Sequence, residues 1–287
     1  MDDCRSQRWR DRRTSFRLPT ETIDASIHSV DVISCQRQAK PFVEQHHYSA
    51  SFPATRLSCG LFRSGPRGSR LVGVASFSVS MSRHAGLKYT GLEGNQSVEL
   101  GRLVLLDEVE ANGESWFLSR AFSLLRREKP DIEAVYAYSD PVPRMDAQGA
   151  LVMPGHVGEI YQAMSARCRG RASGRTHYHT ASGIHLSERT LSKIRLEERG
   201  HEYARRQLRE AGLAAPRFGQ DGRSWIEDLL ERGEIGRRKH PGNWVYSFPL
   251  TRRAKARDHL LPNHPRPVRG PGMLDVTSPQ HNFHFAS

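Results

Sequence analysis

Residues 100–140 read LGRLVLLDEVEANGESWFLSRAFSLLRREKPDIEAVYAYSD, and this stretch decides the predicted fold. Its first part, Leu100–Leu106, is a short apolar run typical of a buried strand. Apolar residues then recur at helical spacing over 117–125, after a predicted helix cap at Asn112. The segment Ile132–Tyr138 alternates like a second strand. A strand, a helix and a strand of these lengths predict a parallel crossover.

The sequence on either side predicts further elements of the same layered structure. Leu71–Val79 is typical of a buried strand, and Asn243–Leu250 has the aromatic and β-branched content of a last strand. Gly158–Ala166 predicts a short helix, and Ser187–Glu210 predicts a charged helix with few apolar anchors. We therefore predict an α/β fold, with one mixed sheet flanked by helices.

The ends of the chain differ in composition from this central part. Residues 1–25 are rich in arginine and predict a basic arm, and residues 251–287 predict a basic tail rich in proline. We expect both to be disordered or loosely packed. The predicted catalytic domain covers residues 26–250, and residues 187–250 form either part of its core or an extension that grips DNA.

The formal net charge of +12 indicates an acidic partner, and nucleic acid is the first candidate. One arginine cluster, which we expect to contact DNA, consists of Arg167, Arg169, Arg171 and Arg175. The alternative is a positive surface that only keeps the protein soluble. No apolar stretch approaches the ~20 residues needed to cross a bilayer, so we expect no membrane partner and a cytoplasmic location. The four cysteines lack a C-x-x-C spacing and predict free thiols.

Polar residues with possible chemistry occur in four short segments. The turn Glu110–Ser115 joins a strand to a helix, where free backbone N–H groups beside Gly113 predict an anion site; the alternative is an ordinary turn. The segment 46–49 (HHYS) offers an acid/base pair or metal ligands, or is simply a polar loop. Asp140 follows a predicted strand, and its possible roles are those of a general base, a metal ligand or a turn residue. Tyr161 offers a proton donor, a stacking surface or a packed ring.

Three histidines near a cysteine raise the question of zinc. His177, His179, His185 and Cys168 match no spacing of a closed structural zinc site. A basic segment lying against nucleic acid explains this region more simply.

The order of these segments resembles the GNAT acetyltransferase superfamily over about residues 30–250. In that fold a strand, a turn that holds phosphates and a helix bind acetyl-coenzyme A, and the next strand splays away to admit it. The turn here departs from the usual Q/R-x-x-G-x-G/A loop, because Glu110 stands first and Ser115 replaces the last small residue.

More narrowly, HHYS, ELGRL, the helix bearing Ser119, YSDP and GEIYQA resemble the phage Mom family. The resemblance implies an enzyme that converts adenine in DNA to an N6-carbamoylmethyl derivative and so protects phage DNA from restriction. It implies acetyl-coenzyme A and an iron ion, Fe(II), as cofactors, DNA as partner and the host cytoplasm as location. A homodimer remains open.

The resemblance also assigns roles to individual residues. It places His47, Tyr48 and Asp140 around a metal or the reacting group, and Tyr48, Arg102, Asp140 and Tyr161 in catalysis. The residues that it implies for coenzyme binding are Arg102, Leu105, Asn112, Gly113, Ser115 and Ser119.

Two other functions remain open at this point. One is an ordinary N-acetyltransferase that acts on a protein or a small amine. The other is a non-catalytic DNA-binding protein on a GNAT scaffold, which the altered turn favours.

Overall fold

The computed structural model describes residues 6–10, 13–18, 20–80, 82–93, 95–145 and 150–268. The chain divides into two compact units. The first comprises residues 1–143, 153–172 and 243–287, and the second comprises residues 144–152 and 173–242. The larger segment of the second unit, residues 173–242, is therefore an insertion between the strands β10 (Arg167–Arg171) and β14 (Trp244–Pro249) of the first, and residues 144–152 are a shorter insertion after β7 (Ala134–Ser139).

The first unit contains a seven-stranded mixed sheet with strand order β10-β14-β7-β6-β5-β4-β3. Its strands are β3 (His28–Ile33), β4 (Thr55–Gly65), β5 (Gly68–Ser78), β6 (Ser97–Leu105), β7 (Ala134–Ser139), β10 (Arg167–Arg171) and β14 (Trp244–Pro249). The pair β6 and β7 is parallel, and the other neighbouring pairs are antiparallel. The helix α3 (Gly113–Glu128) makes the parallel connection, as predicted. This arrangement confirms the predicted α/β fold with one mixed sheet flanked by helices.

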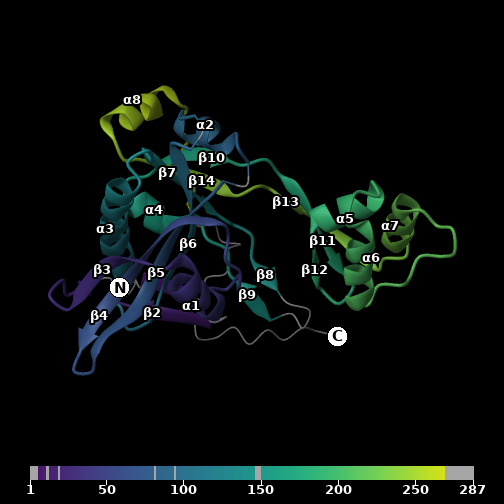
Figure 1. Cartoon of the computed structure of the whole chain (residues 1–287), viewed down its shortest axis with the longest axis horizontal. Helices are drawn as coiled ribbons and strands as arrows, with labels where there is room; N and C mark the ends of the chain where they lie inside the picture. The colour runs from purple at the N-terminus through teal and green to yellow at the C-terminus, as the bar shows by residue number, and fades with distance from the viewer. Residues whose placement is uncertain are drawn as a thin grey trace. The chain divides into compact units, whose positions relative to one another are not determined.

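Helices cover both faces of this sheet (Figure 1). One face packs against α3 and α4 (Glu159–Ala163). The other packs against the π-helix η1 (Cys35–Ala39) and the helices α1 (Lys40–His46), α2 (Ala85–Thr90) and α8 (Arg252–Leu260).

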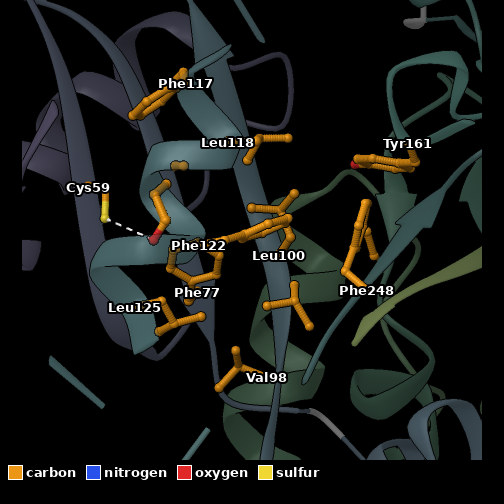
Figure 2. Packing of buried hydrophobic residues seen from close by; sticks show 14 of the residues in the cluster. Cys59, Phe77, Val98, Leu100, Phe117, Leu118, Phe122, Leu125, Tyr161 and Phe248 are labelled. Carbon is orange, nitrogen blue, oxygen red and sulfur yellow. Dashed lines mark hydrogen bonds between the residues drawn. The ribbon is translucent and has the colours of Figure 1, made fainter. Parts of the chain in front are cut away.

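The core under α3 explains why its sequence forms a helix at this place. Phe117, Leu118, Phe122 and Leu125 repeat at helical spacing and are all buried against the sheet (Figure 2). The predicted cap residue Asn112 does stand at the start of α3 but does not cap it. Its side-chain oxygen instead accepts a hydrogen bond of 2.7 Å from the backbone N–H of Ile23.

The second unit has its own core. Its three-stranded antiparallel sheet, in the order β12-β11-β13, consists of β12 (His185–Leu186), β11 (Arg175–Thr180) and β13 (Ile235–His240). The helices α5 (Glu188–Arg195), α6 (His201–Glu210) and α7 (Gly222–Glu231) pack around the fully buried Trp225. The short strands β8 (Arg144–Met145) and β9 (Leu151–Met153) form a separate pair.

The helix predicted over 187–210 is in fact two helices, α5 and α6. Glu197 and Gly200 both adopt positive φ angles, 48° and 88°, which an α-helix does not allow. Leu191, Ile194 and Leu208 are buried as predicted, whereas Tyr203 is 62% exposed.

The predicted N-terminal arm is partly structured. Its described residues form a hairpin of β1 (Ser6–Arg10) and β2 (Arg13–Arg17). Residues 1–5, 11–12 and 19 of this arm, and residues 269–287 of the predicted tail, lie outside the described residues. The tail also contains α8, where Ala254 and Asp258 are buried.

None of the described helices is long and apolar enough to cross a membrane. Cys35, Cys59 and Cys168 are free thiols, as predicted.

Candidate active site

The parallel strands β6 and β7 pair over only three residues of each strand. Ser97, Val98 and Glu99 pair with Ala134, Val135 and Tyr136. Beyond these pairs β6 continues to Leu105 and β7 to Ser139, and no further pairing joins them. The strand β7 therefore splays away from β6 beyond these pairs, as the GNAT resemblance implied.

A cavity of about 660 Å³ lies where these strands separate. Residues 100–105 of β6 and Tyr138 of β7 line it, together with residues from α3 and α4, from the segment after α1 and from other loops. Seven of the predicted site residues are in its lining: His47, Tyr48, Arg102, Leu105, Asn112, Ser115 and Tyr161. Segments far apart in the sequence thus meet at one hollow.

Three predicted site residues are not in the lining of this cavity: Gly113, Ser119 and Asp140. A Cβ at Gly113 would lie 2.4 Å from Val109 Cγ1, so this glycine makes room for a neighbouring side chain and not for a phosphate. Ser119 is exposed, one turn further along α3.

Asp140 is buried and ends β7 as a turn residue. Its Oδ1 accepts a hydrogen bond of 3.0 Å from the backbone N–H of Val142. Its backbone carbonyl accepts another, of 2.8 Å, from the N–H of His156. This geometry favours the turn interpretation over a group that faces a substrate.

Arg102 ties the segment after α1 to β6. Its Nε donates to the Ser51 carbonyl and its Nη2 to the Ser51 Oγ, both at 2.8 Å. Burial lowers the pKa of the Arg102 guanidinium, while the nearby Tyr48 and Glu99 raise it. Its Nη1 also donates to the Gly101 carbonyl at 2.5 Å. Arg102 thus holds in place the segment that carries Tyr48.

His47 and Tyr48 lie together at the end of α1. Their ring centroids are 4.2 Å apart, and His47 Nδ1 accepts a hydrogen bond of 3.1 Å from the Ser49 N–H. In a neutral ring the other nitrogen, Nε2, then carries the proton. Tyr48 presents an aromatic ring to the cavity.

Tyr161 lies on α4 and is buried, with its ring 5.5 Å from that of Tyr246 and 6.0 Å from that of Phe248 (Figure 2). Burial raises its pKa well above the ordinary value, and Tyr48 and Glu99 add to the effect. Its hydroxyl therefore stays protonated at neutral pH. Gly158 permits this packing, because it has a φ of 78° and a Cβ there would lie 2.6 Å from Tyr246 Cε2.

Glu99 belongs to this site although the sequence did not single it out. It lies in the ELGRL motif, at the last paired position before the strands separate. Burial raises the pKa of its carboxyl, and Arg102 partly opposes that shift. An acidic residue between the apolar Val98 and Leu100 of a strand is the signal that points to it.

We expect Glu99→Gln to stabilise the protein near neutral pH. Because the folded pKa lies above the unfolded one, the favourable contribution of this carboxyl is complete at low pH and is lost as the pH rises through the folded pKa. Thermal melting should therefore show a higher Tm for the variant at about pH 8 and no gain at about pH 4. The exposed Glu93→Gln is the control. An equal difference in Tm at both pH values would contradict the burial of a charged Glu99.

The hairpin contributes two further lining residues that sequence reasoning missed, Arg8 and Trp9. Arg8 is buried, pairs with Glu114 in the first turn of α3 and donates to the carbonyls of Val109 and Glu110. The sequence around Arg8 is rich in arginine, and such a segment predicts a solvent-exposed arm. Arg8 can nevertheless be buried, because carbonyls of a turn some hundred residues away accept hydrogen bonds from its guanidinium.

The four arginines predicted to contact DNA differ in exposure. Arg169 is buried, and its guanidinium donates to Asp258, to Ser247 and to the carbonyls of Leu261 and Pro262. It is a structural residue and cannot reach a phosphate. Arg167 is half-buried and pairs with Asp258 at 2.9 Å. Arg171 and Arg175 are exposed.

No group of three or more His, Cys, Asp or Glu side chains is placed to hold a metal ion in the described residues. Cys168 is buried in the core of the first unit, while His177, His179 and His185 belong to the sheet of the second. The backbone N–H of Ser49 donates to His47 Nδ1 and that of Val142 to Asp140 Oδ1, and the role of His47, Tyr48 and Asp140 as iron ligands stays a prediction.

Comparison with known families identifies the chain. The model of the Mom protein family matches residues 28–265. The chain belongs to the Mom protein family. The hairpin with Arg8 and Trp9 precedes the matched residues.

A curated relative and two solved structures resemble the chain. The relative is the methylcarbamoylase mom of Escherichia phage Mu, 27% identical over 168 residues, which are 58% of this chain and 62% of the relative. The chain thus matches less than two thirds of that relative's length. One structure is a tandem GNAT protein of clavulanic acid biosynthesis, with 11% identity, a TM-score of 0.39, and coverage of 78% of this chain and 99% of that one. The other is malonyl-CoA decarboxylase from Cupriavidus metallidurans, with 12% identity, a TM-score of 0.30, and coverage of 72% and 44%.

Proposed function

We propose that this member of the Mom family modifies adenine in DNA and adds a carbamoylmethyl group at N6, which protects the DNA from restriction. The cavity between β6 and β7 carries the proposal. Tyr48, Arg102 and Tyr161, which come from the motifs shared with the family, line one hollow beside Glu99. The name of the phage Mu relative, methylcarbamoylase, supports the same chemistry.

The substrate imposes two requirements on such a site. The exocyclic amine of adenine is a weak nucleophile because its lone pair is delocalised into the ring, so its position must be fixed. The amine is also hidden within a duplex, so the base must leave the stack. The Tyr48 ring suits a flipped base as a stacking surface, and the protonated Tyr161 hydroxyl suits a hydrogen-bond or proton donor.

As cofactor we propose a coenzyme A thioester, acetyl-coenzyme A. The cavity extends from the separated strands to Asn112 and Ser115 at the start of α3, and its volume suits the arm of such a molecule. Arg8 binds this turn through the Glu110 carbonyl and would meet the diphosphate, in place of its present partner Glu114. When bound, the thioester supplies an activated two-carbon group. We assign no step to a metal.

We further propose that Arg171 and Arg175 contact DNA phosphates, with Arg167 beside them. Arg171 is positioned by Trp244, whose ring centroid lies 4.5 Å from the guanidinium carbon.

A nucleoside assay tests the proposal. The chain is expressed in a bacterium that carries a plasmid, the plasmid DNA is digested to nucleosides, and mass spectrometry measures a deoxyadenosine adduct. We expect the adduct with the wild-type chain and with the control Tyr203→Phe, whose hydroxyl is exposed. We expect Tyr161→Phe to lower its yield at least tenfold, since one positioned proton donor typically contributes about 10²–10⁴-fold.

Two results would contradict the proposal. Acetylated free amines with unmodified DNA would indicate an ordinary acetyltransferase. DNA binding without any adduct would indicate a non-catalytic binding protein. An unchanged yield in Tyr161→Phe, with the adduct present, would leave the modification intact and remove the role of that hydroxyl. Asp140→Ala tests in the same way whether that buried residue acts in the reaction.

A further inference from the structure

A second cavity, of about 510 Å³, lies between β3 and α3. Its polar and aromatic lining consists of His28, Ser29, Trp116, Arg120, Ser123 and Arg127. No carboxylate is among its lining residues. The catalytic proposal uses none of these side chains.

Four of these residues form one face of α3. Positions 116, 120, 123 and 127 are spaced by four, three and four residues, so they lie along one side of the helix. The opposite side, which bears Phe117 and Leu118, is buried in the core. The face toward the second cavity therefore combines an aromatic ring, a hydroxyl and two guanidinium groups.

Arg120 is held in place by contacts other than an ion pair. Its guanidinium carbon lies 3.5 Å from the Trp116 ring centroid, and its Nη1 donates to the Trp116 carbonyl at 3.3 Å. Within the described part of the chain no carboxylate pairs with it. A cation fixed in this way retains its charge for an incoming anion.

Arg127 completes the pair of cations. It forms an ion pair of 2.8 Å with Glu128, but its side chain is 70% exposed. An exposed ion pair of this kind contributes little to stability, so an anion can replace Glu128 as the partner of Arg127.

A buried histidine is among the lining residues of the cavity. His28 is buried there, and its Nδ1 donates to the Asp24 carbonyl at 2.8 Å. Its Nε2 lies 3.8 Å from Glu110 Oε2, and neither atom has a hydrogen-bond partner among the described residues. The His28 side chain is fully buried, so it supports the wall of the cavity and does not itself contact a ligand.

We propose that this second cavity binds a backbone phosphate of the DNA, with Arg120 and Arg127 as its cationic ligands. The proposal rests on DNA being the substrate. The first turn of α3 supports it, because Glu114 and Ser115 line the catalytic cavity while the next residue, Trp116, lines the second one. The two cavities therefore flank the first turn of α3, which places the proposed phosphate site next to the catalytic cavity.

The test measures duplex binding by fluorescence anisotropy at several salt concentrations, with Arg120→Gln/Arg127→Gln against Arg126→Gln. Arg126 is exposed on the same helix but does not line the cavity, so a single variant at this position is the control. Arg120→Gln and Arg127→Gln are also measured singly, because each removes one positive charge, as the control Arg126→Gln does. Losing one phosphate contact should reduce the slope of log K against log salt by about 1 in the double variant. We expect no change of slope for Arg126→Gln and unchanged melting temperatures throughout.

Each outcome decides the proposal. Equal losses for Arg126→Gln and the single cavity variants would show a net-charge effect and overturn it, as would a wild-type slope in the double variant. If inorganic phosphate binds the wild-type chain while the double variant keeps the wild-type slope for DNA, the cavity binds a free anion and not DNA. This result would also overturn the proposal. The binding assay is independent of the adduct, so a lower slope without adduct supports the cavity while the proposed modification fails.

Discussion

An Asp258→Ala variant is expected to lose about 3–5 kcal/mol of its free energy of unfolding. Asp258 lies on α8 and is 2% exposed. It pairs with Arg169 and Arg167 and accepts a hydrogen bond of 2.8 Å from Ser247 Oγ. The Arg169 side chain is also 2% exposed, so removal of the carboxylate leaves a buried cation without an anion.

Denaturant unfolding followed by circular dichroism measures this loss. The control is Glu128→Ala, which removes an exposed partner of Arg127 and should cost less than about 1 kcal/mol. The double variant Arg169→Met/Asp258→Leu should recover most of the stability, because it removes both buried charges. If Asp258→Ala lost no more stability than Glu128→Ala, the pair would not be buried in solution.

Arg102→Lys is expected to lower the yield of modified deoxyadenosine about a hundredfold, since a small misplacement of a reacting group can cost this much. Arg102 donates to the carbonyl and to the hydroxyl of Ser51 from two nitrogens of one planar group. The single ammonium of lysine cannot reproduce this fork. The segment that carries His47 and Tyr48 should then be less well held against β6.

Arg56→Lys provides the matched control. Arg56 also donates to a carbonyl, that of Asn95, and to a side chain, that of Asp131, each at 2.8 Å, but it does not line the cavity. We expect it to keep wild-type yield. As a positioning residue, Arg102 should show its effect through Tyr48, so that adding Arg102→Lys to Tyr48→Ala lowers the yield little further. A wild-type yield in Arg102→Lys, or a full additional loss in the double variant, would contradict this role.

The sequence alone predicted the central β6–α3–β7 unit and the last strand, β14. Their periodicities are local, so each element could be identified from a few consecutive residues. Site residues could also be predicted from sequence where they lie in a short motif. The segments with Tyr48, Arg102 and Tyr161 were identified in this way, and all three residues line one cavity. Asp140 carries an equally distinct motif but is not in the lining of this cavity, and its Oδ1 accepts the N–H of Val142, so its role in the reaction stays a prediction.

Only the tertiary structure decided which charged residues are buried. Arg8 and Arg169 have the same arginine-rich neighbours as exposed arginines, and their acceptors lie about a hundred residues away in the sequence. The place of β14 between β7 and β10, and the cavity beside Trp116 and Arg120, likewise depend on segments that meet only in the folded chain. Local composition fixes the charge of a side chain, but its partners, and hence its role, depend on contacts that no local pattern contains.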